Sequence, residues 1–131
     1  MCIFCKIINH EIPSSVVYED DNYLAILDIS QVTLGHTLVM PKKHYDNILS
    51  MPTEEFKEYS MVIHKLAKSI QKNTSCTGMN ILNNTNEVAG QTVNHVHFHI
   101  IPRYSNEDSI KIEFNQSKKQ DLDKVLQMLN K

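Results

Sequence analysis

The chain has 131 residues, a formal net charge of -2, 41% hydrophobic residues and 21% charged residues. This length and composition predict one globular domain with a single core. The nearly balanced charge gives no global basic field, which argues against nucleic acid and membrane surfaces as partners. No apolar run approaches the roughly 18 residues of a membrane-spanning helix, and the N-terminus lacks a signal-peptide pattern. Three cysteines, an odd number, favour a reducing cytoplasmic setting over a disulfide framework.

The first half of the chain predicts a short helical or looped segment, three strands and a helix. The initial segment covers residues 2–10, and the β-rich residues 16–20 and 23–30 flank an acidic hairpin turn. Residues 34–44 indicate a third strand that starts after Gly35 and ends at Pro41. From Thr53, apolar residues recur at steps of three and four, so a helix of about five turns follows.

The second half predicts two more strands and a last helix. Residues 78–84 indicate a fourth strand, residues 86–93 a glycine-containing loop, and residues 95–101 a fifth strand that Pro102 ends. Ser117 and Gln120 have capping-box spacing ahead of an apolar series, which predicts a C-terminal helix. Several adjacent strands, one long helix and no regular βαβ alternation indicate an α+β fold with a mainly antiparallel sheet.

Three histidines alternate with apolar residues in the predicted fifth strand. Because strand side chains alternate between faces, His95, His97 and His99 share one face. Neighbours in this series would lie about 6.6 Å to 6.8 Å apart and the outer pair about 13 Å apart, which would strain a site holding one ion with all three. The alternation alone leaves a metal site, a catalytic set and a solvent-facing polar side all open.

The segment just before the histidines offers neutral groups suited to phosphate oxygens. Gly90 allows close approach of the backbone, Gln91 supplies an amide and Thr92 a hydroxyl. Taken alone, this segment is a plain turn. Next to three histidines it indicates a site for breaking a bond at phosphorus, because a neutral imidazole carries a free lone pair near neutral pH.

Four segments, in this order, resemble the histidine triad (HIT) superfamily: CIFCKII, EIPSSVVYEDDNYLAILDIS, GHTLVMPKKHYDNI and NEVAGQTVNHVHFHIIPR. The resemblance covers roughly residues 2–103 of a single HIT domain spanning 1–131, with 104–131 as a C-terminal extension. It implies an antiparallel sheet of about five strands with a long helix. It also implies a homodimer formed through the helix and a strand.

The resemblance implies a hydrolase that attacks the α-phosphorus of a purine nucleotide conjugate, forms a covalent nucleotidyl-histidine and releases AMP. His97 matches the nucleophile, with a backbone carbonyl holding its second nitrogen protonated. His99 matches the histidine that contacts the phosphate and helps protonate the leaving group, and His95 the one that orients the site. The other matches are phosphate and nucleotide contacts, a ribose carboxylate, a further histidine and a base cleft: Gln91, Thr92 and Asn84; Asp28; His36; and Ile3, Phe4, Ile7, Ile26 and Ile29. A turn position for Asp28 and ordinary core positions for the cleft residues are equally valid interpretations.

Cys2 and Cys5 form a C-x-x-C pair whose surroundings lack the βαβ context of a thioredoxin-like redox site. Many HIT proteins bind zinc with such a pair and two histidines, which match His44 and His95 here. Four protein ligands would make a closed, structural site. The resemblance therefore implies structural zinc and no organic cofactor. Cys76, without a partner, is expected to be a small buried residue.

Four functions stay open on the sequence. The first is hydrolysis of purine nucleoside phosphoramidates or related conjugates. The residues Ile-Ile-Pro-Arg after the triad resemble the diadenosine polyphosphate branch, so Arg103 keeps dinucleoside polyphosphate hydrolysis as an alternative. The others are a nucleotide-binding regulatory protein with incidental turnover, although binding alone needs no nucleophile, and a zinc-dependent hydrolase.

Overall fold

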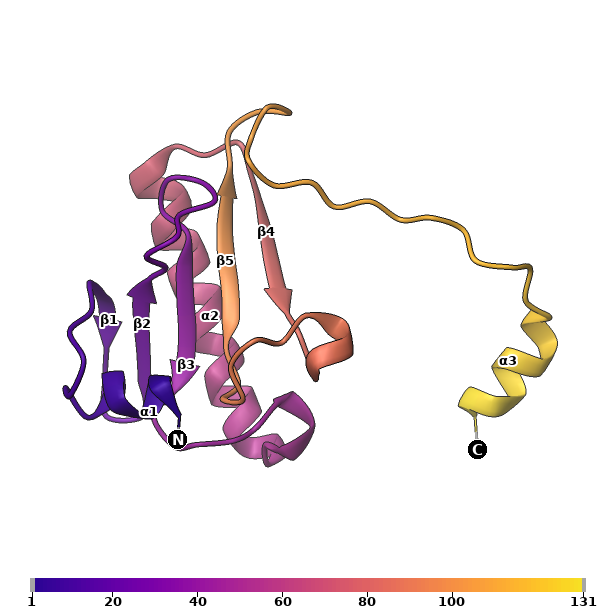
Figure 1. Ribbon diagram of the computed structural model, residues 1–131, viewed down its shortest axis with the longest axis horizontal. Helices are drawn as coiled ribbons and strands as arrows, with labels where there is room; N and C mark the ends of the chain where they lie inside the picture. The colour runs from indigo at the N-terminus through magenta and orange to yellow at the C-terminus, as the bar shows by residue number, and fades with distance from the viewer. Residues whose placement is uncertain (1, 131) are drawn as a thin grey trace.

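The computed structural model describes residues 2–130. Its elements are α1 (Ile3–Ile8), β1 (Val16–Glu19), β2 (Tyr23–Leu27), β3 (Thr37–Pro41), the 3-10 turn η1 (Ile48–Ser50), α2 (Thr53–Thr74), β4 (Gly78–Asn83), the 3-10 turn η2 (Glu87–Ala89), β5 (Phe98–Arg103) and α3 (Leu122–Leu129). The strands form one five-stranded sheet, in the order β1-β2-β3-β5-β4, in which every neighbouring pair is antiparallel (Figure 1). The predicted α+β fold with one long helix and a short C-terminal helix is confirmed.

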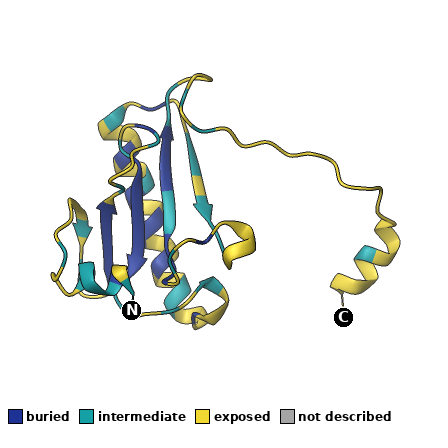
Figure 2. Ribbon diagram, in the orientation of Figure 1, coloured by how far each residue is buried: buried dark blue, intermediate teal, exposed yellow. Residues whose placement is uncertain are grey.

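The long helix α2 covers one face of the sheet. It has 22 residues, which make about six turns where about five were expected, and its buried side chains recur at helical spacing. Leu66 and the fully buried Tyr59 pack with Val39 of β3 and Ile100 of β5, and Tyr59 donates its hydroxyl to the Val39 carbonyl. This face is the larger part of the core (Figure 2).

The short helix α1 packs on the opposite face. Phe4 is buried there with a second cluster of sheet residues, namely Leu24, Ile26, Leu38 and Met40. The first turn of α1 is capped by Cys2, whose sulfur accepts from the Cys5 N–H at 3.2 Å. The histidines of the chain's second half lie on this α1 side of the sheet, because Phe98 and Ile100 point toward α2.

The fifth strand differs from its prediction at both ends. It begins at Phe98 rather than at residue 95, because the backbone before it has other partners: the Val96 N–H donates to the Tyr45 carbonyl at 2.8 Å. It also continues through Pro102 to Arg103. The Arg103 carbonyl accepts from the Thr77 N–H, on the β4 side, so the backbone nitrogen of Pro102 points toward the β3 side. The ladder between β3 and β5 has already ended there, at Ile100. The missing N–H of the proline therefore breaks no ladder bond.

The C-terminal segment leaves the body of the protein as an extended arm. Residues 111–121 are exposed throughout, and α3 lies at the end of the arm, away from the sheet (Figure 1). The capping-box prediction is wrong, because the N-cap of α3 is Asp121, whose side chain accepts from the Asp123 and Lys124 N–H groups. No helix within residues 2–130 is both long and apolar enough to cross a membrane.

Two isoleucines of contrasting burial test the placement of the core. Ile100 is fully buried, and Ile29 is fully exposed. We expect Ile100→Ala to lower the free energy of unfolding by about 2–5 kcal/mol, because it leaves a cavity between the sheet and α2. Ile29→Ala should change it by less than about 0.5 kcal/mol. Urea denaturation of both variants measures the difference, and equal losses would contradict this core.

Candidate functional site

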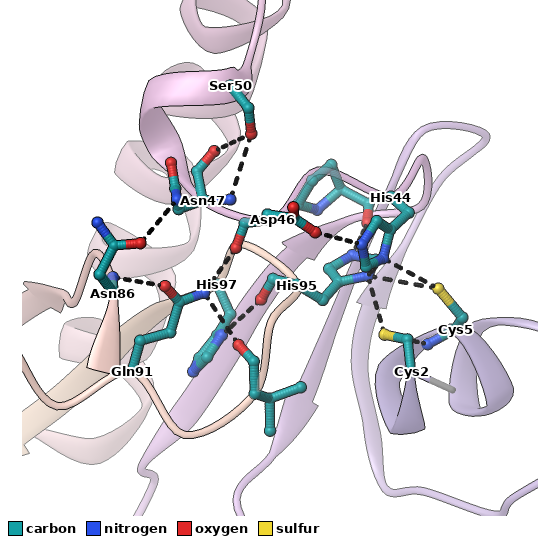
Figure 3. Close-up of polar contacts among 12 residues, drawn as sticks. Cys2, Cys5, His44, Asp46, Asn47, Ser50, Asn86, Gln91, His95 and His97 are labelled. Carbon is teal, nitrogen blue, oxygen red and sulfur yellow. Dashed lines mark hydrogen bonds and ion pairs between the residues drawn. The ribbon is translucent and has the colours of Figure 1, made fainter.

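Two cysteines and two histidines from distant parts of the chain meet beside α1 (Figure 3). The His95 Nδ1 atom lies 3.4 Å from the Cys2 sulfur and 3.5 Å from the Cys5 sulfur. The His44 Nδ1 atom lies 3.4 Å from the Cys5 sulfur and 3.1 Å from the His95 Nδ1. The structure thus brings together all four residues expected as metal ligands.

The second nitrogen of each histidine in this cluster has its own partner. The His95 Nε2 lies 2.8 Å from the Pro41 carbonyl oxygen, and the His44 Nε2 lies 2.9 Å from an Asp46 carboxylate oxygen. These contacts place the Nε2 protons on the outside and leave both Nδ1 lone pairs pointing at the sulfurs. Asp46 was not anticipated from the sequence, since an acid two residues from a histidine carries no specific signal.

The donor set and its spacing fit a tetrahedral zinc ion. With ordinary zinc bond lengths, sulfur and nitrogen ligands are about 3.5 Å apart and two nitrogens about 3.3 Å apart. The separations here run from 3.1 Å to 3.5 Å. Burial, together with the hydrogen bond and charge of Cys2, raises the pKa of the Cys5 thiol to about 11. Binding of zinc would therefore release a thiol proton.

His97 is held by the backbone of His95. Its Nδ1 lies 2.8 Å from the His95 carbonyl oxygen, so Nδ1 carries the proton and Nε2 is left with a free lone pair. This is the backbone contact expected for the nucleophile. Burial lowers the pKa of His97, against the opposing effects of that carbonyl and of Asp28. The Phe4 ring meets the imidazole edge to face, with centroids 4.9 Å apart.

Asn83, the last residue of β4, holds the backbone carbonyl of His97. Its Nδ2 donates to the His97 carbonyl at 3.0 Å, and its Oδ1 accepts from the Thr85 hydroxyl at 3.2 Å. This contact reaches across the start of the β4–β5 ladder, where Asn83 lies opposite Phe98. The sequence carries no signal for this role of Asn83, because the contact depends on the register of the β4–β5 ladder.

The side chains of His36 and His99 are hydrogen-bonded to each other next to His97. The His36 Nε2 and His99 Nδ1 are 2.9 Å apart, and the Val32 N–H donates to the His36 Nδ1 at 3.4 Å. Because the His36 Nδ1 accepts, its Nε2 carries the proton and donates to His99, whose own proton must then be on Nε2. Burial and the nearby His97 and His36 lower the pKa of His99 to about 4. Burial also lowers the pKa of His36, so both rings are neutral near pH 7.

Asp28 lies at the end of β2 and serves the turn that follows it. One carboxylate oxygen accepts from the Ser30 N–H at 2.8 Å, and the other lies 3.6 Å from the His36 Nε2. The Asp28 N–H also donates to the His36 carbonyl at 3.0 Å. The turn interpretation and a position beside the histidines therefore both hold for this residue.

The loop before the histidines is held by Gln91. This buried side chain donates to the Asp46 and Val93 carbonyls and accepts from the Asn86 N–H at 2.7 Å (Figure 3). All polar atoms of the Gln91 amide are thus engaged with backbone, and in this structure the residue shapes the loop. Gly90 has a φ of 98°, which explains the need for glycine at this point.

Thr92 and Asn84, the other residues expected to contact the nucleotide, border the same loop. Thr92 is exposed and lines a surface hollow with Cys2, Ile3 and Asp46. Asn84 donates its Nδ2 to the Gly90 carbonyl at 3.4 Å. Thr92 is therefore accessible to a ligand, whereas Asn84 has a partner within the loop.

The five residues expected to line a base cleft differ in how far they are buried. Phe4 and Ile26 are buried in the α1-side cluster, and Ile7 packs against that cluster while partly exposed. Ile3 is half exposed, and Ile29 is fully exposed. The Phe4 ring also contacts the His97 imidazole. Ile29 lies in the Asp28–Ser30 turn, with its side chain exposed to solvent.

Comparison with known proteins gives one consistent picture. The family model described as HIT domain matches residues 9–106. An uncharacterized HIT-like protein of Methanocaldococcus jannaschii is 52% identical over 126 residues, covering 96% of each chain. An adenylylsulfatase of Arabidopsis thaliana is 39% identical over 102 residues, which cover 78% of this chain and 52% of that protein.

Two solved structures share the fold over nearly the whole chain. A HIT family member from Bacillus subtilis superposes with a TM-score of 0.91 at 45% identity, covering 98% of this chain and 94% of its own. A histidine triad nucleotide-binding protein from Candida albicans gives a TM-score of 0.85 at 32% identity, covering 99% and 93%. The alternating histidines, the fold around them and these similarities together establish that the chain belongs to the HIT domain family, a family of nucleotide-binding proteins and nucleotide hydrolases.

Proposed function

We propose that this protein is a cytoplasmic, homodimeric nucleotidyl hydrolase that cleaves purine nucleoside phosphoramidates or related conjugates and releases AMP. The observation that carries this proposal is the bond from the His97 Nδ1 to the His95 carbonyl at 2.8 Å. It leaves an unprotonated Nε2 on a neutral imidazole, the form that attacks an electrophile. The Arabidopsis relative supports the substrate class, because an adenylylsulfatase acts on adenylyl sulfate, which is a nucleotide conjugate.

The proposed reaction has two displacements at the α-phosphorus. In the first, the His97 Nε2 lone pair forms a bond to phosphorus, and the bond to the leaving group breaks. The leaving group departs with that electron pair and takes up a proton from solvent. In the second, a water oxygen bonds to phosphorus, the phosphorus–Nε2 bond breaks, and the water loses a proton to solvent. The His97 imidazole is positively charged while it carries the nucleotide, and the His95 carbonyl, which accepts from Nδ1, stabilises that charge.

His99 is proposed to bind the phosphate and leaving group as a hydrogen-bond donor. The contact with His36 leaves its proton on Nε2, and its ring centroid lies 5.2 Å from that of His97. A donor placed beside the nucleophile stabilises the charge that develops on the leaving group. His36 acts through His99 and is a positioning residue in this scheme. Asp28 is proposed to accept the ribose hydroxyls, and Thr92 to donate to the phosphate.

We also propose that Cys2, Cys5, His44 and His95 hold a structural zinc ion. Four protein ligands close the coordination shell, so the metal would supply stability and would tie α1 to the loop after β3. The chemistry is assigned to His97, which is outside the ligand set. A zinc-dependent hydrolase would need an open ligand position, and this set of four donors gives no support to that alternative.

The alternative of dinucleoside polyphosphate hydrolysis depended on Arg103. In the structure its guanidinium donates to the Asp108 carboxylate at 2.8 Å and to the Asn80 side chain at 2.7 Å. It anchors the turn after β5 and is engaged before any ligand arrives. This favours the smaller conjugates as substrates.

The nucleophile can be tested by trapping its adduct. We expect the wild-type protein, quenched with acid during turnover of adenosine phosphoramidate, to carry a mass increase of one AMP on His97. His97→Ala should lose the adduct and at least about 10³-fold in kcat, because no other group supplies the attacking lone pair. Intact-protein and peptide mass spectrometry measure the adduct.

A matched histidine variant controls for this test. His10 is exposed and has a φ of 62°, which asparagine tolerates, so His10→Asn should keep both adduct and rate. AMP binding without any adduct or turnover in the wild type would instead support the regulatory-protein alternative.

A substrate panel separates the two hydrolase types. We expect kcat/KM for adenosine phosphoramidate to exceed that for diadenosine tetraphosphate by at least about tenfold, corresponding to about 1.4 kcal/mol of transition-state binding. Adenylyl sulfate should be the third substrate of the panel. The reverse order, together with a loss of polyphosphate turnover in Arg103→Met, would establish the other type.

Metal content and stability test the zinc proposal. Protein purified with zinc should contain one equivalent per chain, and a chelator should lower the melting temperature by about 10 °C, since a few kcal/mol of binding energy is lost. Cys5→Ser should lose the metal, whereas Cys76→Ala, which alters a buried cysteine outside the cluster, should keep it. Full metal loss with an unchanged melting temperature would contradict a structural role.

A further inference from the structure

The turn between β2 and β3 (residues 28–36, Figure 1) is closed by the side chain of Gln31. The Gln31 Nε2 donates to the Asp28 carbonyl at 2.6 Å and to the His36 carbonyl at 2.7 Å. Its Oε1 accepts from the Gly35 N–H at 2.8 Å. Since a carbonyl oxygen only accepts and an N–H only donates, one orientation of the amide makes all three bonds. Gln31 is an exposed residue, so these contacts with backbone indicate that it holds the turn.

The second half of the turn has other supports. Thr33 and His36 are buried. The Leu34 carbonyl accepts from the Tyr104 hydroxyl at 2.6 Å, and the His36 side chain is hydrogen-bonded to His99. The side of the turn that contacts the proposed leaving-group donor is therefore fixed without Gln31.

The first half of the turn depends on Gln31. Ile29 and Ser30 are exposed, and the Ser30 N–H bond to the Asp28 carboxylate joins two residues of this same half. Among the hydrogen bonds described for residues 2–130, the two halves are joined by the Gln31 amide and by the Asp28 N–H, which donates to the His36 carbonyl at 3.0 Å. Removal of the amide would leave Asp28 with that single backbone bond to the second half, and its carboxylate would be less firmly placed beside the histidines.

We propose that Gln31 is a positioning residue that sets a preference for ribonucleotides over 2′-deoxyribonucleotides. This role rests on the proposed function, in which the Asp28 carboxylate accepts the ribose hydroxyls. The Ser30 N–H occupies one of about four acceptor positions of that carboxylate and leaves others for the two hydroxyls. A carboxylate held in place before the nucleotide arrives costs less to order on binding. A ligand without the 2′-hydroxyl gains less from this, so Gln31 acts on selectivity as well as on affinity.

Binding of AMP and 2′-deoxy-AMP to the full-length chain, measured by titration calorimetry, tests this role. The wild-type protein should bind AMP at least about tenfold more tightly than 2′-deoxy-AMP. Gln31→Met keeps the length of the side chain and removes its hydrogen bonds. It should weaken AMP binding at least about tenfold and 2′-deoxy-AMP binding less than about twofold, so the ratio of the two dissociation constants falls at least about fivefold.

Two further variants assign the effect to the amide. Gln31→Glu keeps an acceptor for the Gly35 N–H but has no N–H to donate at neutral pH, so it should lose the preference as Gln31→Met does. Gln71 also donates its Nε2 to a backbone carbonyl, that of Cys76 at 3.4 Å. Gln71→Met is therefore the matched control and should change neither dissociation constant.

An unchanged ratio in Gln31→Met, or a full preference in Gln31→Glu, would overturn the proposal. Equal weakening of both nucleotides would also overturn it, because a merely structural role predicts that result. So would a wild-type protein that binds both nucleotides alike. These measurements follow the binding of a product, whereas the His97 adduct reports hydrolysis, so failure of this role is distinguishable from failure of the proposed function.

Discussion

The hydrogen bond from the His97 Nδ1 to the His95 carbonyl connects the two parts of the site. The side chain of His95 belongs to the cysteine–histidine cluster, while its backbone oxygen sets the tautomer of His97, the next histidine along the chain. His95 is fully buried, and its Nε2 is held by the Pro41 carbonyl at the end of β3. A displacement of His95 would therefore move the carbonyl that orients His97. The proposed metal would act on the chemistry in this indirect way, by keeping a backbone atom in place.

Burial has a second effect, which is to keep the imidazoles neutral. It lowers the pKa of His97 and His36, and together with the nearby His97 and His36 it lowers that of His99 to about 4. Neutral rings each have one donor and one acceptor nitrogen, so the contacts from Val32 through His36 to His99 assign every proton. The result is an acceptor nitrogen on His97 beside a donor nitrogen on His99. A nucleophilic displacement at phosphorus needs these two opposite properties side by side.

The parts of this arrangement that follow from local sequence were predictable. The alternation of histidines with apolar residues predicted that the apolar residues face the core, and Val96, Phe98 and Ile100 do pack on the α2 side, although of the three histidines only His99 lies within β5. The period of α2 likewise predicted its apolar, buried face. Contacts that depend on tertiary packing were not predictable. Asn83 reaches the His97 carbonyl because the β4–β5 register places it there. Likewise, the engagement of Gln91 with three backbone groups and the anchoring of Arg103 by Asp108 follow from loop geometry that no motif encodes.

The account depends most directly on which nitrogen of His97 carries the proton. Long-range proton–nitrogen correlation spectra of protein labelled with ¹⁵N-histidine report this for each ring at neutral pH, with His97→Gln to assign the signals. The account predicts that His97 is neutral, with a protonated Nδ1 and an unprotonated Nε2. A neutral ring protonated at Nε2, or an imidazolium, would contradict it, because neither form has the lone pair that attacks the phosphorus.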